Sequence, residues 1–478
     1  MHGAAVAIVI LLTACVACAA PPRPPLAEID AAFAARIEPL AMRAAAAGHT
    51  ELAAAIREWP LPPDDGRQFA VAVPPRLEMP AGLVAVAAPD AAAATAIWDD
   101  FVAARQRHAA ETFAHVEAAA PCAATRLIHR VLRDDPEHEQ ARAAAGWVLA
   151  KQGWVWPQAR RHRDRGDEWD ARFGWLPRGR LARYRDGERY HRGRWITAAA
   201  DDSLVLTVKD GRRFVSDHWE ITATAPLAAA AALAAELEEA HAVWRQVFGP
   251  LAVAPRGRRS PGRAPAAQAE PFVALLCRDR RGYLAEFEPL EPAIGMTQGA
   301  YWAPTRTLWL VATSAADDAA ASRATVRHEA THQLCAESRP TSPLAGERCG
   351  FWAIEAAACY MESIRPEPFG WSVGGREAGR MPAARTLLVE DGFLVPLAEL
   401  TALGRAAFQA DPRIARLYTQ LGGLADFFMN GAEGRYREAF VAYLARIYDG
   451  TADSDTLARL CDTGYADLDA AYSRHLSR

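Results

Sequence analysis

The sequence has no excess of positive charge and no long hydrophobic run. Its 478 residues carry 54 Lys and Arg against 58 Asp and Glu, a net charge of -4, so charge gives no reason to expect a nucleic-acid partner. The apolar stretch at residues 4–16 is too short to cross a membrane as a stable helix. With 51% hydrophobic and 23% charged residues, the chain has an ordinary globular composition and room for two to four domains.

The sequence also lacks the paired cysteine spacing of a zinc ribbon or zinc finger. Its cysteines are Cys15, Cys18, Cys122, Cys277, Cys335, Cys349, Cys359 and Cys461. In an oxidising compartment a disulfide could join Cys335 to Cys349 across the short stretch between them. For Cys277 and Cys359 we favour the alternative that they are small apolar residues inside a core.

The amino-terminal residues have the pattern of an export signal. Ala19-Ala20 follows the apolar run, so we expect residues 1–20 to be a secretory signal. Leu12-Thr13-Ala14-Cys15 is similar to the lipobox of bacterial lipoproteins, in which the cysteine receives the lipid. Against a lipoprotein, no Lys or Arg precedes the apolar run. The sequence therefore predicts an exported cell-envelope protein, either attached to a membrane through a lipidated Cys15 or soluble after secretion.

The strongest motif is His328-Glu329-Ala330-Thr331-His332, inside a stretch with helical character. Residues four apart lie on one face of an α-helix, so His328 and His332 can offer two imidazole nitrogens to one metal ion. Glu329 projects beside that metal, where its carboxylate could take a proton from a bound water. The alternative is that two histidines on a helix match this spacing by chance. A third ligand is needed to distinguish a metal site from such a match.

Glu355 is the candidate third ligand. It lies 23 residues beyond His332, in a second helical stretch at 351–362 that we expect to run antiparallel to the first. Two histidines and one glutamate leave the fourth position of a tetrahedral zinc ion open to water. The sequence thus predicts one Zn²⁺ per chain, held by His328, His332 and Glu355.

These residues resemble the gluzincin zinc metallopeptidases of the thermolysin-like superfamily, which carry His-Glu-x-x-His and a later glutamate. More narrowly, Trp352-x-x-Glu355-Ala356-x-Ala358-x-Tyr360 is similar to the Trp-x-x-Glu-Gly-x-Ala-x-Tyr block of an uncharacterised bacterial envelope family in that superfamily. This chain has alanine where the block has glycine, and a helix tolerates the added methyl group. The resemblance covers roughly the second half of the chain.

The resemblance implies a role for each of these side chains. His328, His332 and Glu355 would bind the zinc, and Glu329 would be the catalytic base. Members of this superfamily usually supply a tyrosine or histidine that donates to the developing oxyanion, and Tyr418 is our candidate. The alternative for Tyr418 is a core tyrosine.

Glu362 is a candidate supporting residue. It lies seven residues after Glu355, on the same face of the predicted helix. Its carboxylate could accept a hydrogen bond from the far nitrogen of a ligand histidine and fix the tautomer of that ring. A surface or helix-capping carboxylate is the alternative.

The resemblance also implies a strand that binds substrate. Residues 307–311 are predicted to form a strand just upstream of the histidine motif, and in gluzincins a strand in that place is the sheet edge that pairs with an extended peptide. Trp309 would then lie near the cleft. Gly299-Ala300-Tyr301 stands where related aminopeptidases carry Gly-Ala-Met-Glu-Asn. No carboxylate follows here to bind a free amino group, so we expect an endopeptidase.

The predicted fold class is α+β. We expect a gluzincin-like metallopeptidase domain with a small mixed sheet, an edge strand, the histidine helix and the glutamate helix. Asp210-Gly211, between apolar runs, predicts a hairpin. The expected divisions are the signal at 1–20, a mostly helical N-terminal region at 21–152, a connecting segment at 153–212, the catalytic domain at 213–370 and a helical C-terminal subdomain at 371–478.

Two features upstream of the catalytic domain have less direct interpretations. Residues 127–136, with a helix resuming after Glu137, resemble a single helix–turn–helix of the tetratricopeptide kind, which cannot make a solenoid alone. Gly-Trp segments recur at Gly153-Trp154, Gly174-Trp175 and Gly193-Arg194-Trp195. Their indoles could stack on cell-wall sugars, but we favour small turns whose tryptophans fill a shared core. The basic stretch 256–263 is expected to be a flexible insertion.

The sequence therefore supports two hypotheses. The preferred one is a zinc-dependent peptidase of the cell envelope, an endopeptidase whose partner is a protein or peptide substrate and not a nucleic acid. The alternative is a catalytically inactive scaffold that keeps the peptidase fold, or an envelope protein that binds the cell wall through its Gly-Trp segments.

Overall fold

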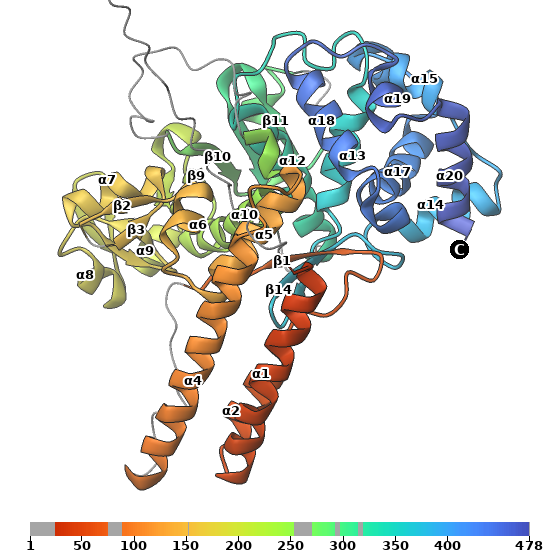
Figure 1. The fold of residues 1–478 in the computed structure, drawn as a ribbon. Coiled ribbons are helices and arrows are strands. Elements are labelled where there is room, and N and C mark those ends of the chain that lie inside the picture. The colour runs from red at the N-terminus through yellow and green to blue at the C-terminus, as the bar shows by residue number, and fades with distance from the viewer. Residues whose placement is uncertain are drawn as a thin grey trace, which may run out of the picture.

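The computed structural model describes residues 24–74, 88–151, 153–252, 270–291, 297–313 and 319–477. The protein is mixed α+β, with many helices around small sheets (Figure 1). The predicted signal with Cys15, and the basic stretch 256–263, lie outside the described residues. Among the described helices, none is both long enough and apolar enough to cross a membrane.

A five-stranded sheet occupies the centre of the molecule, in the order β11-β12-β10-β9-β8. Strands β9, β10 and β12 are parallel, while β8 and β11 pair antiparallel at the two edges. Strand β12 is buried except at its last residue, whereas β9 and β10 have one buried face and a partly exposed one, with Val273 of β10 exposed. The five strands are β8 (Arg212–Val215), β9 (Trp219–Ala223), β10 (Phe272–Cys277), β11 (Gly299–Trp302) and β12 (Thr307–Val311).

Helices cover both faces of this sheet. Helix α10 (Leu227–Val247) packs on β8 and β9, and α12 (Ala319–Glu337) packs on α10, β11 and β12. Leu233, Leu237 and Trp244 of α10 are buried, as their helical spacing predicts. On the other face α11 (Arg280–Phe287) forms a separate cluster with β10 and β12.

The C-terminal half of the chain is helical and shares the main core. Helix α13 (Phe351–Met361) is buried along its whole length and packs on α17 (Ile414–Gly434). Leu417, Leu421, Leu424 and Phe428 lie on one face of α17 and are all buried. The other helices of this part are α14 (Met381–Val389), α15 (Leu397–Ala402), α16 (Arg405–Gln409), α18 (Arg437–Tyr448), α19 (Thr456–Cys461) and α20 (Tyr465–Ser477).

The N-terminal region is mostly helical, as predicted. Helices α1 (Leu26–Ala46), α2 (Thr50–Arg57) and α4 (Ala88–Phe113) share a small core of their own and extend away from the body (Figure 1). The predicted helix–turn–helix is present as α5 (Pro121–Asp134) and the short α6 (Glu139–Ala144). Helix α5 lies against α10, which joins this region to the body.

A small sheet connects distant parts of the chain. Strand β1 (Gln68–Val71) pairs antiparallel with β14 (Gly370–Val373), which also pairs with β13 (Arg365–Glu367). Gln68 Nε2 donates to the hydroxyl of Tyr360 on α13 at 2.7 Å. No local sequence pattern indicates this pairing, because β1 is four residues long and its partner lies about 300 residues away.

The Gly-Trp segments form three consecutive β-hairpins, each followed by a short helix. Trp175 is buried, while Trp154 and Trp195 are half-buried, so the tryptophans are largely packed, as the interpretation we favoured predicts. The elements in chain order are β2 (Val148–Ala150), β3 (Gly153–Val155), α7 (Pro157–Arg165), β4 (Glu168–Asp170), β5 (Gly174–Leu176), α8 (Leu181–Arg185), β6 (Glu188–His191), β7 (Arg194–Thr197) and α9 (Ala198–Asp202).

Two sequence predictions about strands are wrong. Residues 307–311 are not the edge of the sheet, because β12 lies between β10 and β11, and β11 is the edge. Trp309 does not face the cleft. Its ring stacks on Phe287 of α11, with ring centroids 5.0 Å apart, while Leu308 and Leu310 point into the main core. The hairpin at Asp210-Gly211 is also absent, because this dipeptide follows a 3-10 turn and β8 pairs with β9 instead.

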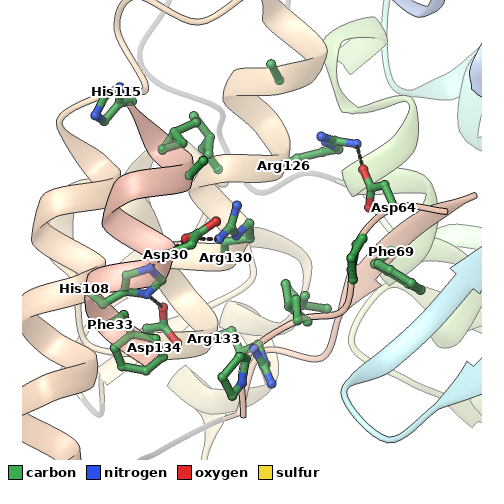
Figure 2. A pocket seen from close by; sticks show the side chains of 18 of the residues that line it. Asp30, Phe33, Asp64, Phe69, His108, His115, Arg126, Arg130, Arg133 and Asp134 are labelled. Carbon is green, nitrogen blue, oxygen red and sulfur yellow. Dashed lines mark hydrogen bonds and ion pairs between the residues drawn. The ribbon is translucent and has the colours of Figure 1, made fainter. Parts of the chain in front are cut away.

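A cavity of about 770 Å³ lies where α1 and the end of α4 meet α5 and β1 (Figure 2). Its charged side chains are paired with one another. Arg130 contacts Asp30 at 2.7 Å, and Arg126 contacts Asp64 at 2.9 Å. These ion pairs join the extended helices to the body, and none of the predicted metal or catalytic residues lines the cavity.

The β1–β14 pairing gives a test of the fold. A side chain at Gly370, where φ is +143°, would place its Cβ 2.4 Å from the carbonyl oxygen of Ala70. Gly370→Ala should therefore lower the free energy of unfolding by about 2 kcal/mol or more, measured by urea denaturation followed by tryptophan fluorescence. Gly282→Ala is the control, because its Cβ would make only an ordinary 3.5 Å contact in α11. Equal effects of the two substitutions would contradict the close pairing.

Candidate metal centre

Helices α12 and α13 carry the predicted ligands, and a buried arginine fixes their positions. Arg327, next to His328, donates to Glu236 and Glu239 of α10 at 2.5 and 2.8 Å. A third bond at 2.5 Å reaches the carbonyl oxygen of Ile364, just past the end of α13. One guanidinium thus ties the histidine helix to α10 and to the segment after the glutamate helix.

The structure brings the three predicted ligands together. His328 Nε2 lies 3.3 Å from Glu355 Oε2, and His332 Nε2 lies 3.6 Å from the same oxygen. Two donor atoms that each lie about 2.1 Å from a tetrahedral zinc ion are separated by about 3.4 Å. The observed distances therefore match a shared metal ligand set, and these residues could hold a metal ion.

The charge of Glu355 suits this position. Burial alone would raise the pKa of its carboxyl group, but the adjacent rings of His332 and His328 hold the pKa below its ordinary range. The side chain is only 8% exposed, so little solvent competes for its oxygens. An ionised carboxylate beside two imidazoles is the donor set that zinc prefers in hydrolase sites.

Glu362 contacts the ring nitrogen of His328 that lies on the side away from Glu355. His328 Nδ1 lies 2.8 Å from Glu362 Oε1, which leaves Nε2 as the nitrogen that faces Glu355. Arg380 in turn donates to both oxygens of Glu362, at 2.7 and 2.8 Å. Although burial opposes it, these two neighbours hold the pKa of Glu362 below its ordinary range. A carboxylate that orients a ligand histidine is a common support for a metal.

Glu329 lies under the edge strand of the sheet. Its Oε2 accepts a hydrogen bond from the backbone N–H of Tyr301 in β11, at 3.0 Å. Gly299 lies over the same side chain, because a Cβ there would come within 3.5 Å of Glu329 Cγ. Burial raises the pKa of Glu329 above its ordinary range, although His328 and His332 oppose the shift. A carboxylate with a raised pKa is suited to take up a proton near neutral pH.

Tyr418 also reaches the site. It projects from α17, which packs on α13, and its side chain is half-buried. Burial raises the pKa of Tyr418, and the nearby Glu355 carboxylate raises it further. The Arg380 guanidinium lies 5.9 Å from its ring centroid. The hydroxyl therefore stays protonated and lies near the candidate ligands, so it can act as a hydrogen-bond donor.

A second cluster of His218, Glu238 and His241 could hold a metal by composition alone. However, His218 Nδ1 lies 2.6 Å from Glu238 Oε2, a hydrogen-bond distance that is too short for two ligands of one tetrahedral ion. The other oxygen of Glu238 accepts from the backbone N–H of His218 at 2.9 Å. Glu238 therefore fixes the turn before β9, and the cluster is structural.

The predicted disulfide is not formed. Cys335 and Cys349 are free. The Cys335 sulfur accepts from Trp244 Nε1, and the Cys349 thiol donates to the carbonyl oxygen of Ala452, each at 3.3 Å. Cys277 and Cys359 are buried, as we favoured. Cys359 lies against His328, with which it and Glu362 form a further group of potential ligands.

Sequence reasoning missed Arg327 and Arg380. Arg327 lies in the helix that carries the motif, directly before His328. No spacing pattern in the sequence marks it as a functional residue. Arg380 lies directly before α14, after a glycine-rich stretch at 370–379. Charged residues that act through folded contacts leave no spacing pattern in the sequence, so only the structure identifies them.

Comparison of the chain with models of protein families gives no match, and comparison with curated proteins gives no significant match.

The carboxylate behind His328 gives a test of the centre. Glu362→Gln removes a charged partner of His328 Nδ1, and we expect the Zn²⁺ dissociation constant to rise roughly 10- to 100-fold. The measurement is competition with a chromogenic chelator at fixed pH. Glu377→Gln is the control, because Glu377 is 68% exposed and pairs only with Arg385. An unchanged dissociation constant for Glu362→Gln would remove this residue from the centre.

Proposed function

We propose that the protein is a zinc-dependent peptidase of the gluzincin type, an endopeptidase that hydrolyses peptide bonds in proteins of the cell envelope. The observation that carries this proposal is the convergence of His328, His332 and Glu355 at metal-ligand spacing, with Glu329 beside them under the sheet edge. A structural metal site closes its fourth position with another protein ligand, whereas a hydrolase keeps that position open and places a base beside it.

The residues divide the chemistry among them. Zinc, when bound by the three ligands, supplies a Lewis acid that polarises the scissile carbonyl and lowers the pKa of a water molecule. Glu329 takes a proton from that water and returns it to the leaving nitrogen. Tyr418 donates a hydrogen bond to the oxygen that becomes negative during attack. Glu362, held by Arg380, keeps His328 in one tautomer.

The edge strand supports a peptide as substrate. Among the described residues β11 pairs with β12 alone, and we infer that an extended chain binds along this edge. The N–H of Tyr301 in this strand donates to Glu329, so a peptide bound along β11 would lie next to the base. Trp302 follows Tyr301, so the strand carries no carboxylate for a free amino terminus. This favours cleavage within a chain over removal of its first residue.

Glu329→Gln tests catalysis directly. The substitution keeps the shape of the side chain but removes the base, so we expect the rate of casein cleavage to fall roughly 10²- to 10⁴-fold while zinc stays bound. Zinc content is measured in the same preparations, and Glu399→Gln serves as the control, because Glu399 is an exposed residue of α15 that pairs with Arg413. If zinc-loaded wild type cleaves no unstructured protein, or if Glu329→Gln cleaves as fast, the inactive scaffold becomes the better description.

Tyr418→Phe tests the oxyanion donor. Loss of one hydroxyl that acts only in the transition state should lower kcat roughly 10²- to 10³-fold with little change in KM. The assay uses a quenched fluorescent peptide that wild type cleaves. Tyr465→Phe is the control, because the Tyr465 hydroxyl binds the carbonyl oxygen of Ser454. A lower melting temperature with unchanged kcat would show that Tyr418 is a core residue.

A further inference from the structure

The three β-hairpins between residues 148 and 202, here named the hairpin array, are repeats of one unit. Each unit is a hairpin followed by a helix, and the units are β2–β3–α7, β4–β5–α8 and β6–β7–α9. The same position of each second strand carries a tryptophan, and each tryptophan lies directly opposite a residue of the first strand. These cross-strand pairs are Leu149 with Trp154, Trp169 with Trp175, and Tyr190 with Trp195.

The first-strand member of each pair is exposed. Leu149, Trp169 and Tyr190 are 63%, 43% and 37% exposed. Single exposed apolar side chains are normal on a protein surface. Here, however, all three occupy equivalent places in successive units, about twenty residues apart. The tryptophan behind each one is more buried and holds the hairpin in place. A repeated contact point of this kind fits a partner that is itself a repeating chain.

The array differs from the rest of the chain in charge. Residues 148–202 contain thirteen Lys and Arg against eight Asp and Glu, a net charge of +5, in a chain whose net charge is -4. Arginines also lie over the aromatic rings of the third unit. The guanidinium of Arg180 is 4.0 Å from the ring centroid of Tyr190, and that of Arg183 is 3.8 Å from Trp195. The Arg183 guanidinium already donates to both oxygens of Glu188, whereas Arg180 beside Tyr190 offers an apolar ring and a fork of donors to a carboxylate.

The array lies far from the candidate metal centre. Its β5 packs on β8, the edge of the central sheet opposite to β11 (Figure 1). Gly174 permits this contact, because a Cβ there would lie 2.5 Å from the carbonyl oxygen of Val215. A partner bound on the array therefore leaves the β11 edge and the metal ligands free.

From these observations we infer that the hairpin array binds a linear anionic polysaccharide. The exposed rings stack on the apolar faces of sugars, and the arginines pair with their acidic groups. Carboxylates also occur within the array, and those of Asp170 and Glu188 pair with its own arginines. The excess positive charge is therefore modest and spread over three units, which suits a chain with one charge per sugar better than the closely spaced phosphates of a nucleic acid. A polysaccharide long enough to reach all three units makes three weak contacts at once, so its affinity depends on its length.

Binding of the full-length protein to polygalacturonate tests this inference. Fully methyl-esterified polygalacturonate has the same sugar backbone without charge, poly-L-glutamate has charge without sugar, and oligo-dT is the nucleic acid. We expect polygalacturonate to bind most tightly, with an affinity that falls as salt is added. A fragment too short to reach more than one unit should bind at least about tenfold more weakly than the long chain.

Two substitutions locate the contact. Trp169→Ser and Tyr190→Ser should each weaken polygalacturonate binding roughly 3- to 10-fold, and the double substitution by about the product of the two. Leu460→Ser is the matched control, because Leu460 is 38% exposed and lies on α19, away from the array. Circular dichroism melting confirms that each variant is folded.

The other outcomes overturn the inference. If poly-L-glutamate binds as tightly as polygalacturonate, the array recognises charge alone. If oligo-dT binds more tightly than polygalacturonate, the array is a nucleic-acid-binding surface. Unchanged binding by folded Trp169→Ser and Tyr190→Ser would place any contact elsewhere. The inference does not rest on peptidase activity, because binding is measured without a peptide substrate and can be repeated with Glu329→Gln.

Discussion

The candidate centre depends on the buried guanidinium of Arg327. It binds two glutamates of α10 and a carbonyl oxygen beyond α13, so three segments that are distant in sequence meet at one side chain. Burial of a charge is costly unless it is paired and hydrogen-bonded, and here each of the three guanidinium nitrogens has a partner. The next residue along the chain is His328. The position of the first ligand is therefore set by an ion network outside the metal site.

Further contacts hold the ligands and their supporting residues in place. His328 is hydrogen-bonded to Glu362, and Arg380 donates to both oxygens of Glu362. The ring of Tyr418 lies near the same guanidinium. Glu355 rises from a helix that is buried on all sides, so its carboxylate cannot move without disturbing the core. Rigid support of this kind keeps ligand distances suited to a metal.

The sequence predicted the parts of the site that depend on local spacing. His328 and His332 are one helical turn apart, and Glu355 was predicted because it lies in the next helical stretch, 23 residues further on, within the Trp-x-x-Glu block. The strand edge was predicted wrongly because a strand order is a property of pairings. Residues 307–311 are strongly apolar and looked like the important strand. The true edge at Gly299–Trp302 is short and mixed in character, and it is ordered by its bonds to β12 and by Glu329. Pairing of β1 with β14 was likewise beyond any local pattern.

The β1–β14 pairing also constrains the order of folding. Ala70 of β1 belongs to the main core, which includes residues as late as Leu476. Contacts of such long sequence separation form slowly, because the chain between them must be ordered first. A polypeptide emerging from the ribosome therefore cannot complete its interior until its final helices have been synthesised. Until then the earlier strands and helices lack part of the apolar surface against which they finally pack.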